Sequence, residues 1–157
     1  MESFKKLNNI LGWSVFAIAS FVYLSTIEQT VSFSDCGEYI ATAYKLEVGQ
    51  PPGAPLFQLL GRIFSLFAEP ATSQVAIAIN VMSALCSSFT ILFLFWTITA
   101  FGKRLLSRSD EKNNDSFKSI SILAAGVVGA LTYTFTDSFW FSAVEGCLLY
   151  TSPSPRD

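Results

Sequence analysis

Two carboxylates, Asp35 and Glu38, stand three residues apart between long uncharged runs of the chain. A carboxylate that faces a substrate can act as a general base and remove a proton from a reacting hydroxyl. The same spacing fits a helix start, with Asp35 as N-cap and Glu38 in the first turn. Spacing alone favours the cap. The two roles are compatible, because a capping carboxylate can still turn its second oxygen towards a cleft.

A proline-punctuated stretch follows, made of Gln50, Pro51, Pro52 and Gly53. Proline lacks a backbone N–H and pushes the preceding residue towards extended geometry, so this stretch predicts a rigid turn. Pro55 suits the first position of a second short helix that continues to Ala68. The polar residues of that helix form one narrow stripe: Gln58, Gly61, Arg62 and Ser65.

Arg62 has two interpretations. Its guanidinium could grip the phosphate of a lipid-linked substrate, because guanidinium and phosphate match in charge and in hydrogen-bonding geometry. Alternatively, the side chain extends to the lipid headgroups, as arginine does near membrane surfaces. The second interpretation is the more common one for a surface helix.

The composition is that of a membrane protein. Of the 157 residues, 14% are charged and 51% are hydrophobic, and the mean hydropathy is +0.45; soluble domains are about a quarter charged. Three uncharged runs predict transmembrane helices, at residues 10–27, 75–101 and 119–136. The first could instead be a signal peptide, but its hydrophobicity continues past the small residues that resemble a cleavage site. We expect an all-α polytopic membrane protein with two short surface helices in the first outer loop.

Basic residues predict the orientation of these runs, because lysine and arginine collect on the cytoplasmic side. Lys5 and Lys6 precede the first run, and five more lie in the link 102–118. The amino terminus and that link are therefore expected in the cytoplasm. The loop 28–74 is expected outside it. We expect a bacterial inner-membrane protein with this loop in the periplasm.

The third run contains two pairs of small residues spaced four apart, Ala125 with Gly129 and Gly126 with Ala130. Such pairs let membrane helices approach closely, which predicts a packing face. Glycine is also simply common in membrane helices, so the pattern leaves both explanations open. After this run, aromatic and acidic residues mix from Asp137 to Glu145, as in an interfacial belt.

The remaining composition excludes several classes. The three cysteines show neither metal-ligand spacing nor an obvious disulfide partner, so no metal or other cofactor is expected. The net charge of −2 gives no reason to expect nucleic acid. Residues 147–157 resemble translated sequencing-adapter DNA, and we expect 1–146 to be the amino-terminal part of a longer polytopic protein.

Three segments stand out together: 35–38 (Asp-Cys-Gly-Glu), 50–57 (Gln-Pro-Pro-Gly-Ala-Pro-Leu-Phe) and 139–146 (Phe-Trp-Phe-Ser-Ala-Val-Glu-Gly). Together they resemble bacterial polytopic membrane proteins related to the transmembrane protein O-mannosyltransferases, of the GT-C class of glycosyltransferases. The resemblance covers residues 1–146. It implies transfer of a sugar, mannose or a similar hexose, from a polyprenyl-phosphate donor to a serine or threonine hydroxyl of an exported protein.

The resemblance also implies roles for residues. Asp35 matches the essential acid near the start of the family's first outer loop and would be the general base, with Glu38 orienting it or the acceptor. Relatives commonly have histidine where this chain has Gln50, which can position a substrate but cannot carry a proton charge. Pro51, Pro52, Gly53, Arg62 and Glu145 complete the expected substrate-binding set.

A non-enzymatic alternative is a membrane scaffold or transporter component whose outer loop only caps helices. Transporters favour ionisable residues inside their spans, and the three runs here have none. The isolated 157 residues are expected to be inactive even if the parent protein is an enzyme, because a site between the first loop and later helices would lack its second half.

Overall fold

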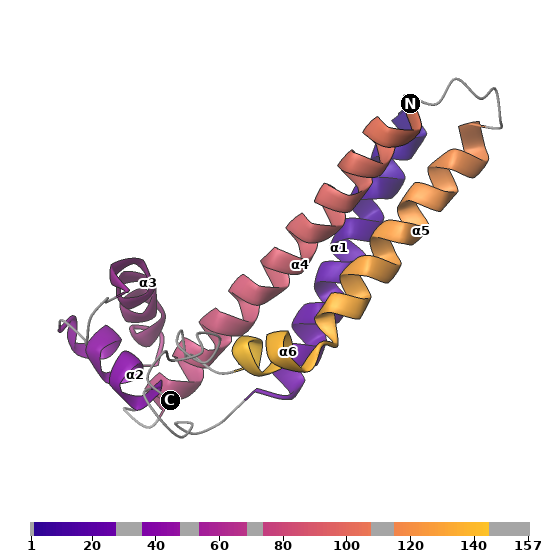
Figure 1. The fold of residues 1–157 in the computed structure, drawn as a ribbon. Helices are drawn as coiled ribbons and strands as arrows, with labels where there is room; N and C mark the ends of the chain where they lie inside the picture. The colour runs from indigo at the N-terminus through magenta and orange to yellow at the C-terminus, as the bar shows by residue number, and fades with distance from the viewer. Residues whose placement is uncertain (1, 28–35, 48–53, 69–73, 108–114, 145–157) are drawn as a thin grey trace, which may run out of the picture. The chain divides into compact units, whose positions relative to one another are not determined.

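The computed structural model describes residues 2–27, 36–47, 54–68, 74–107 and 115–144, and all regular structure within them is helical (Figure 1). The predicted all-α class is confirmed. The helices are α1 (Glu2–Ser25), α2 (Cys36–Lys45), α3 (Pro55–Ser65), α4 (Val75–Ser107), α5 (Asp115–Thr134) and α6 (Asp137–Val144).

Three of these helices, α1, α4 and α5, are long and apolar enough to cross a membrane. Their 24, 33 and 20 residues correspond to roughly 36, 50 and 30 Å at the usual rise of about 1.5 Å per residue, against a hydrocarbon core of about 30 Å. Each contains all or nearly all of one of the three predicted runs. The chain is therefore a multi-pass membrane protein.

The helices extend beyond the uncharged runs. α1 starts at Glu2 rather than near residue 10, and α4 continues to Ser107, into the stretch expected to be a loop from residue 102. Lysine, arginine and leucine have high helix propensity, so loss of hydrophobicity does not end a helix. The segment expected to be an interfacial belt after residue 136 forms α6, which the charge and aromatic pattern did not predict.

The chain divides into two compact units. Unit 1 comprises residues 1–22 and 87–136, and unit 2 comprises residues 23–86 and 137–157. α1 and α4 each contribute to both units, because the boundaries fall within these helices. Unit 1 thus holds the greater part of the three membrane-spanning helices, and unit 2 holds the short ones.

In unit 1, the fully buried Phe95 of α4 lies between the other two helices. A Cβ placed on Gly12 of α1 would be 3.2 Å from Phe95 Cδ1, and one placed on Gly126 of α5 would be 3.0 Å from Phe95 Cε2. The rings of Phe16 and Phe89, 4.7 Å apart, extend the α1–α4 contact. Glycine on both neighbours lets their backbones close around one large ring.

These contacts also define the direction of the helices. Lys103 lies over Phe4 near the start of α1, and Phe89 lies against Phe16 further along it. α1 and α4 are therefore antiparallel, as successive membrane spans must be. Of the small residues in α5, Gly126 and Ala130 are buried and Ala125 is exposed. Gly129 also approaches α4 closely, since a Cβ there would be 2.9 Å from Ile98 Cδ1.

Replacing Gly126 with valine tests this face. A Cβ at 126 would lie 2.8 Å from Thr99 Cγ2, so α5 must move away from α4; such overpacking costs about 1–3 kcal/mol. We expect Gly126→Val to lower the thermal unfolding midpoint of the full-length protein in detergent. Ala125→Val, one residue away on the exposed side, is the control. Equal midpoints for the two variants would show that α5 does not pack through Gly126.

Candidate functional site

The site is built on α2, which begins at Cys36, directly after Asp35, where the capping pattern predicted a helix start. Asp35 itself lies outside the described residues. Cys36, Tyr39 and Ala43 are buried at helical spacing and make one face of α2. Glu38 is half-buried in the first turn, where the helix dipole favours a negative charge. A carboxylate is thus attached to a helix that is itself held in place.

The end of α2 has a defined geometry. Leu46 adopts a left-handed backbone conformation with φ of 56°, and the Glu47 N–H donates to the Thr42 carbonyl at 3.0 Å. This is the pattern of a Schellman motif, which usually has glycine at the left-handed position. The turn directs the chain out of α2 towards the proline-rich stretch that follows.

α3 packs closely against α2 through a glycine. A Cβ on Gly61 would come 2.9 Å from the Cβ of Ala43, so the two backbones approach as closely as small residues allow. The ring centroids of Tyr39 and Phe57 lie 6.1 Å apart in an edge-to-face arrangement that reinforces the contact.

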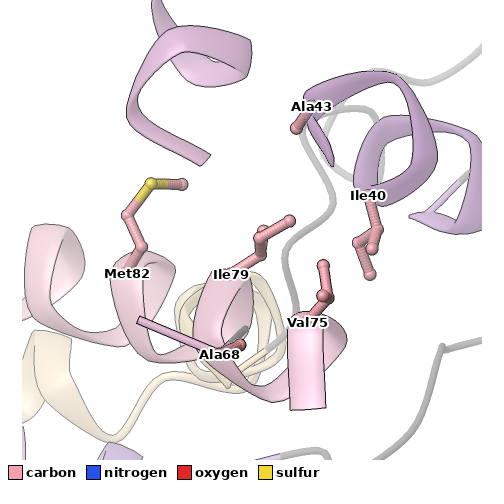
Figure 2. Packing of buried hydrophobic residues seen from close by; sticks show 6 residues of the cluster. All are labelled: Ile40, Ala43, Ala68, Val75, Ile79 and Met82. Atoms are coloured by element: carbon pink, nitrogen blue, oxygen red, sulfur yellow. The ribbon is translucent and has the colours of Figure 1, made fainter. Parts of the chain in front are cut away.

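Both helices also pack against the start of α4. The buried cluster in Figure 2 joins Ile40 and Ala43 of α2 to Ala68 after α3 and to Val75, Ile79 and Met82 of α4. Figure 2 shows the Ile40 and Val75 side chains close together, with Ile79 between them and Met82. Burial of apolar side chains in a contiguous cluster holds α2 at a defined place in unit 2.

The polar stripe predicted on α3 faces inwards. Gly61 and Ser65 are buried, and Gln58 and Arg62 are half-buried. The outward face instead carries large apolar side chains, with Leu56 70% and Phe67 84% exposed and Leu59, Ile63 and Leu66 more than half exposed. A helix on a water-exposed surface has the opposite arrangement, and this one suits an apolar environment outside the unit.

Arg62 is held at the α2–α3 contact rather than extended. Its guanidinium carbon lies 5.1 Å from the ring centroid of Tyr44, a cation–π distance. Arg62 also donates to the Ser65 hydroxyl at 3.4 Å, and that hydroxyl donates to the Arg62 carbonyl at 2.7 Å. Extension to lipid headgroups, the more common behaviour, is not the conformation in the structure.

Glu38 and Tyr44 occupy the first and last turns of α2 and are six positions apart, or about 9 Å along the helix. The docked pair of helices therefore carries the Glu38 carboxylate near the start of α2. It places the Arg62 cation against Tyr44, near the end of the same helix. No role was assigned to Tyr44 from the sequence. Its role under Arg62 was missed because the sequence does not show which α2 side chain faces which α3 side chain.

α6 packs in the same unit. The Tyr23 ring, fully buried near the end of α1, lies 6.2 Å from Phe139 and 6.3 Å from Trp140. The Ser83 hydroxyl of α4 donates to the Ser142 carbonyl at 3.3 Å. The chain that leads directly into Glu145 is thus part of the unit that contains Glu38 and Arg62.

The other predicted site residues, Gln50, Pro51, Pro52, Gly53 and Glu145, lie outside the described residues, as does the tail 147–157. Among the described residues, no group of three or more histidine, cysteine, aspartate or glutamate side chains could hold a metal ion. Lys45, exposed at the end of α2, lies 3.9 Å from the carboxylate of Glu47 in a surface ion pair. Such exposed pairs contribute little to stability.

Comparison with known proteins places this region in a family. The family profile described as the protein O-mannosyl-transferase TMEM260 N-terminal domain matches residues 35–151. The protein O-mannosyl-transferase tmem260 of Dictyostelium discoideum is 30% identical over 132 residues, which cover 84% of this chain and 14% of that protein. The TMEM260 protein of Mus musculus, also called a protein O-mannosyl-transferase, is 34% identical over 86 residues, covering 54% of this chain and 12% of that protein.

The chain thus spans about one seventh or less of the length of these relatives. No solved structure matches it.

The α2–α3 contact can be tested with Gly61→Ala. The added Cβ meets the rigid Cβ of Ala43, so we expect the full-length protein to lose about 1–3 kcal/mol of stability through overpacking. Hydrogen exchange of the α2 amides should accelerate together with a fall in the thermal midpoint.

A second substitution makes the test specific. Ala43→Gly removes the opposing Cβ and should recover stability in the double variant, apart from the cost of about 0.5–1 kcal/mol for glycine in a helix. A double-mutant cycle measures this coupling. Ala41→Val, on the exposed side of α2, is the matched control. Additive effects at positions 61 and 43 would contradict the proposed close approach.

Proposed function

This chain belongs to the family of TMEM260 N-terminal domains, and from this premise we propose that it begins a membrane glycosyltransferase that transfers mannose or a similar hexose to a protein hydroxyl. The donor would be a polyprenyl-phosphate-linked sugar and the acceptor a serine or threonine of an exported protein. The observation that carries the proposal is the docking of α2. The helix that directly follows Asp35, where the family match begins, is fixed against α3 and α4 by the buried cluster.

A fixed helix start is what a general base needs. In the proposed reaction the acceptor hydroxyl gives its proton to the Asp35 carboxylate while its oxygen attacks the anomeric carbon of the sugar. The bond between that carbon and the phosphate oxygen breaks, and the lipid phosphate leaves with the electron pair. Attack opposite the leaving group inverts the anomeric carbon. Glu38, one turn into α2, would orient Asp35 or the acceptor.

Arg62 would bind the donor phosphate. Its guanidinium lies against the Tyr44 ring, so part of the entropy cost of ordering the side chain is already met before a ligand arrives. Gln50, Pro51, Pro52 and Gly53 link the two docked helices in the sequence and would position the substrate. Glu145, which follows α6, would approach from the other segment of unit 2.

The apolar outer face of α3 supports a position for the proposed site at the membrane surface. We place Leu59, Ile63 and Phe67 in the outer leaflet, with the inward stripe of α3 against α2. α3 has 11 residues and is too short to span, so it would lie along the surface. This position would bring α2 to the level of lipid headgroups, where the phosphate of a lipid-linked sugar also lies, on the side opposite the basic link 102–118.

Asp35→Asn tests the base in the full-length protein. The amide keeps the capping oxygen but cannot take a proton, so we expect sugar transfer to fall by about 100-fold or more at unchanged expression and thermal stability. Glu38→Gln should lower transfer less. Asp137→Asn, at the start of α6, is the control for loss of an acidic N-terminal helix residue. Normal transfer by Asp35→Asn would leave Asp35 as a helix cap only.

Arg62→Gln tests the phosphate site. A charge-assisted hydrogen bond contributes about 1.5–3 kcal/mol, so we expect the KM for the lipid-linked donor to rise roughly tenfold to a hundredfold. Arg62→Lys should recover part of the loss, because it keeps the charge but not the planar fork. Lys45→Gln, in the exposed ion pair, should leave KM unchanged. A fall in stability with an unaltered KM would restrict Arg62 to holding α3 on Tyr44.

A further inference from the structure

Unit 1 carries a groove on one face of α4. It has a volume of about 340 Å³ and is lined by Phe93, Trp96, Thr97, Ala100, Phe101 and Arg104. These residues recur at three-to-four spacing along the helix, so they share one side of it. The volume is at the lower end of the range of about 300–1,000 Å³ for small-molecule sites. It suits a portion of one ligand rather than a protein domain.

The wall of the groove is apolar. Phe93 and Phe101, which both line the groove, are 58% and 60% exposed. They lie about two helical turns apart and form its two rims. The Thr97 hydroxyl donates to the Phe93 carbonyl at 2.7 Å, so its hydrogen-bonding capacity is used within the helix. The Trp96 ring lies between the groove and α1, since its Nε1 would be 2.7 Å from a Cβ on Gly12.

One end of the groove is cationic. Arg104 lines it and makes no hydrogen bond, ion pair or ring contact with any other described residue. Lys103 lies 5.6 Å from the Phe4 ring, which brings Lys5 and Lys6 of α1 to the same end of unit 1.

α5 adds a further cation at this end. Ile122 contacts the position of Gly102, and Lys118 precedes Ile122 by one turn. The acids of the described residues at this end are Glu2 and Asp115. Among the described residues, positive charge therefore predominates at this end of unit 1, where Arg104 lines the groove.

We propose that the α4 groove binds an anionic phospholipid, with the phosphate on Arg104 and one acyl chain between Phe93 and Phe101. The site is distinct from the proposed sugar-transfer site, whose described residues are all in unit 2. Basic pockets at the ends of membrane helices suit anionic headgroups, and arginine binds phosphate through paired hydrogen bonds. A single amphipathic ligand matches both the charged mouth and the apolar wall.

A second helix fits this face less well. The helix contacts of unit 1 at Gly12, Gly102 and Gly126 each use a glycine for close approach. Here two exposed phenylalanine rims would keep a helix backbone at a distance, and a helix would also have to supply an acid to Arg104. A flexible acyl chain can enter between the rims, and its own phosphate neutralises the arginine.

Native mass spectrometry of the delipidated full-length protein, titrated with phosphatidylglycerol or phosphatidylcholine, tests the proposal. We expect phosphatidylglycerol to bind more tightly, and Arg104→Gln to weaken it about fivefold, the factor for one basic residue near a membrane surface. Phe101→Ala should weaken both lipids. Lys118→Gln, a cation of the same end outside the groove, should have a smaller effect. Equal losses for Arg104→Gln and Lys118→Gln would indicate diffuse attraction and overturn the site.

A photoreactive benzophenone side chain at Thr97 identifies the occupant directly. We expect its cross-linked product in membranes to carry the mass of a phospholipid, whereas the same group at Val128, exposed on α5, should give less of it. A cross-link from position 97 to a later segment of the same protein would show that a helix covers the groove, and it would overturn the proposal.

Discussion

Close approach of helix backbones is the constraint on which both units depend. Between membrane helices there is no hydrophobic driving force, because lipid is as apolar as the side chains, so stability comes from van der Waals contact. In unit 1, Gly12 and Gly126 meet the buried Phe95 from either side; in unit 2, Gly61 meets Ala43. At each of these positions glycine has no Cβ, and a Cβ there would hold the two helices apart. The positions of α5 against α4 and of α3 against α2 follow from these contacts.

Because the small and polar residues of α3 face α2, with Phe57, Leu60 and Phe64 packed against the buried cluster, the outward face carries Leu56, Leu59 and Ile63. This arrangement links the packing of unit 2 to its proposed function. One contact both fixes the helix that follows Asp35 and turns an apolar face outwards. The same contact holds the Arg62 cation over Tyr44 rather than extended from the surface. The position of α2, the outward apolar face of α3 and the placement of the Arg62 cation therefore all depend on the close approach of Gly61 and Ala43.

Several features were predictable from local sequence. Uncharged runs long enough to cross a bilayer indicated α1, α4 and α5; the acid pair indicated the start of α2, and Pro55 the start of α3. Other features were not. α6 was missed because eight residues mixing aromatics and polar groups fit an interfacial belt as well as a helix. The extensions of α1 and α4 were missed because helix propensity, unlike hydropathy, does not fall at a charged residue.

Composition and spacing along single segments were enough to predict the all-α class of the protein and its three membrane-spanning segments. Three outcomes came from tertiary contacts alone: which side of α3 is buried, which small residues of α5 pack on α4, and that Tyr44 receives the Arg62 guanidinium. These outcomes depend on pairs of residues distant in sequence, Gly61 with Ala43 and Gly126 with Phe95. A periodic pattern indicates that a helix has two faces, but the shape of its neighbour decides which face is buried.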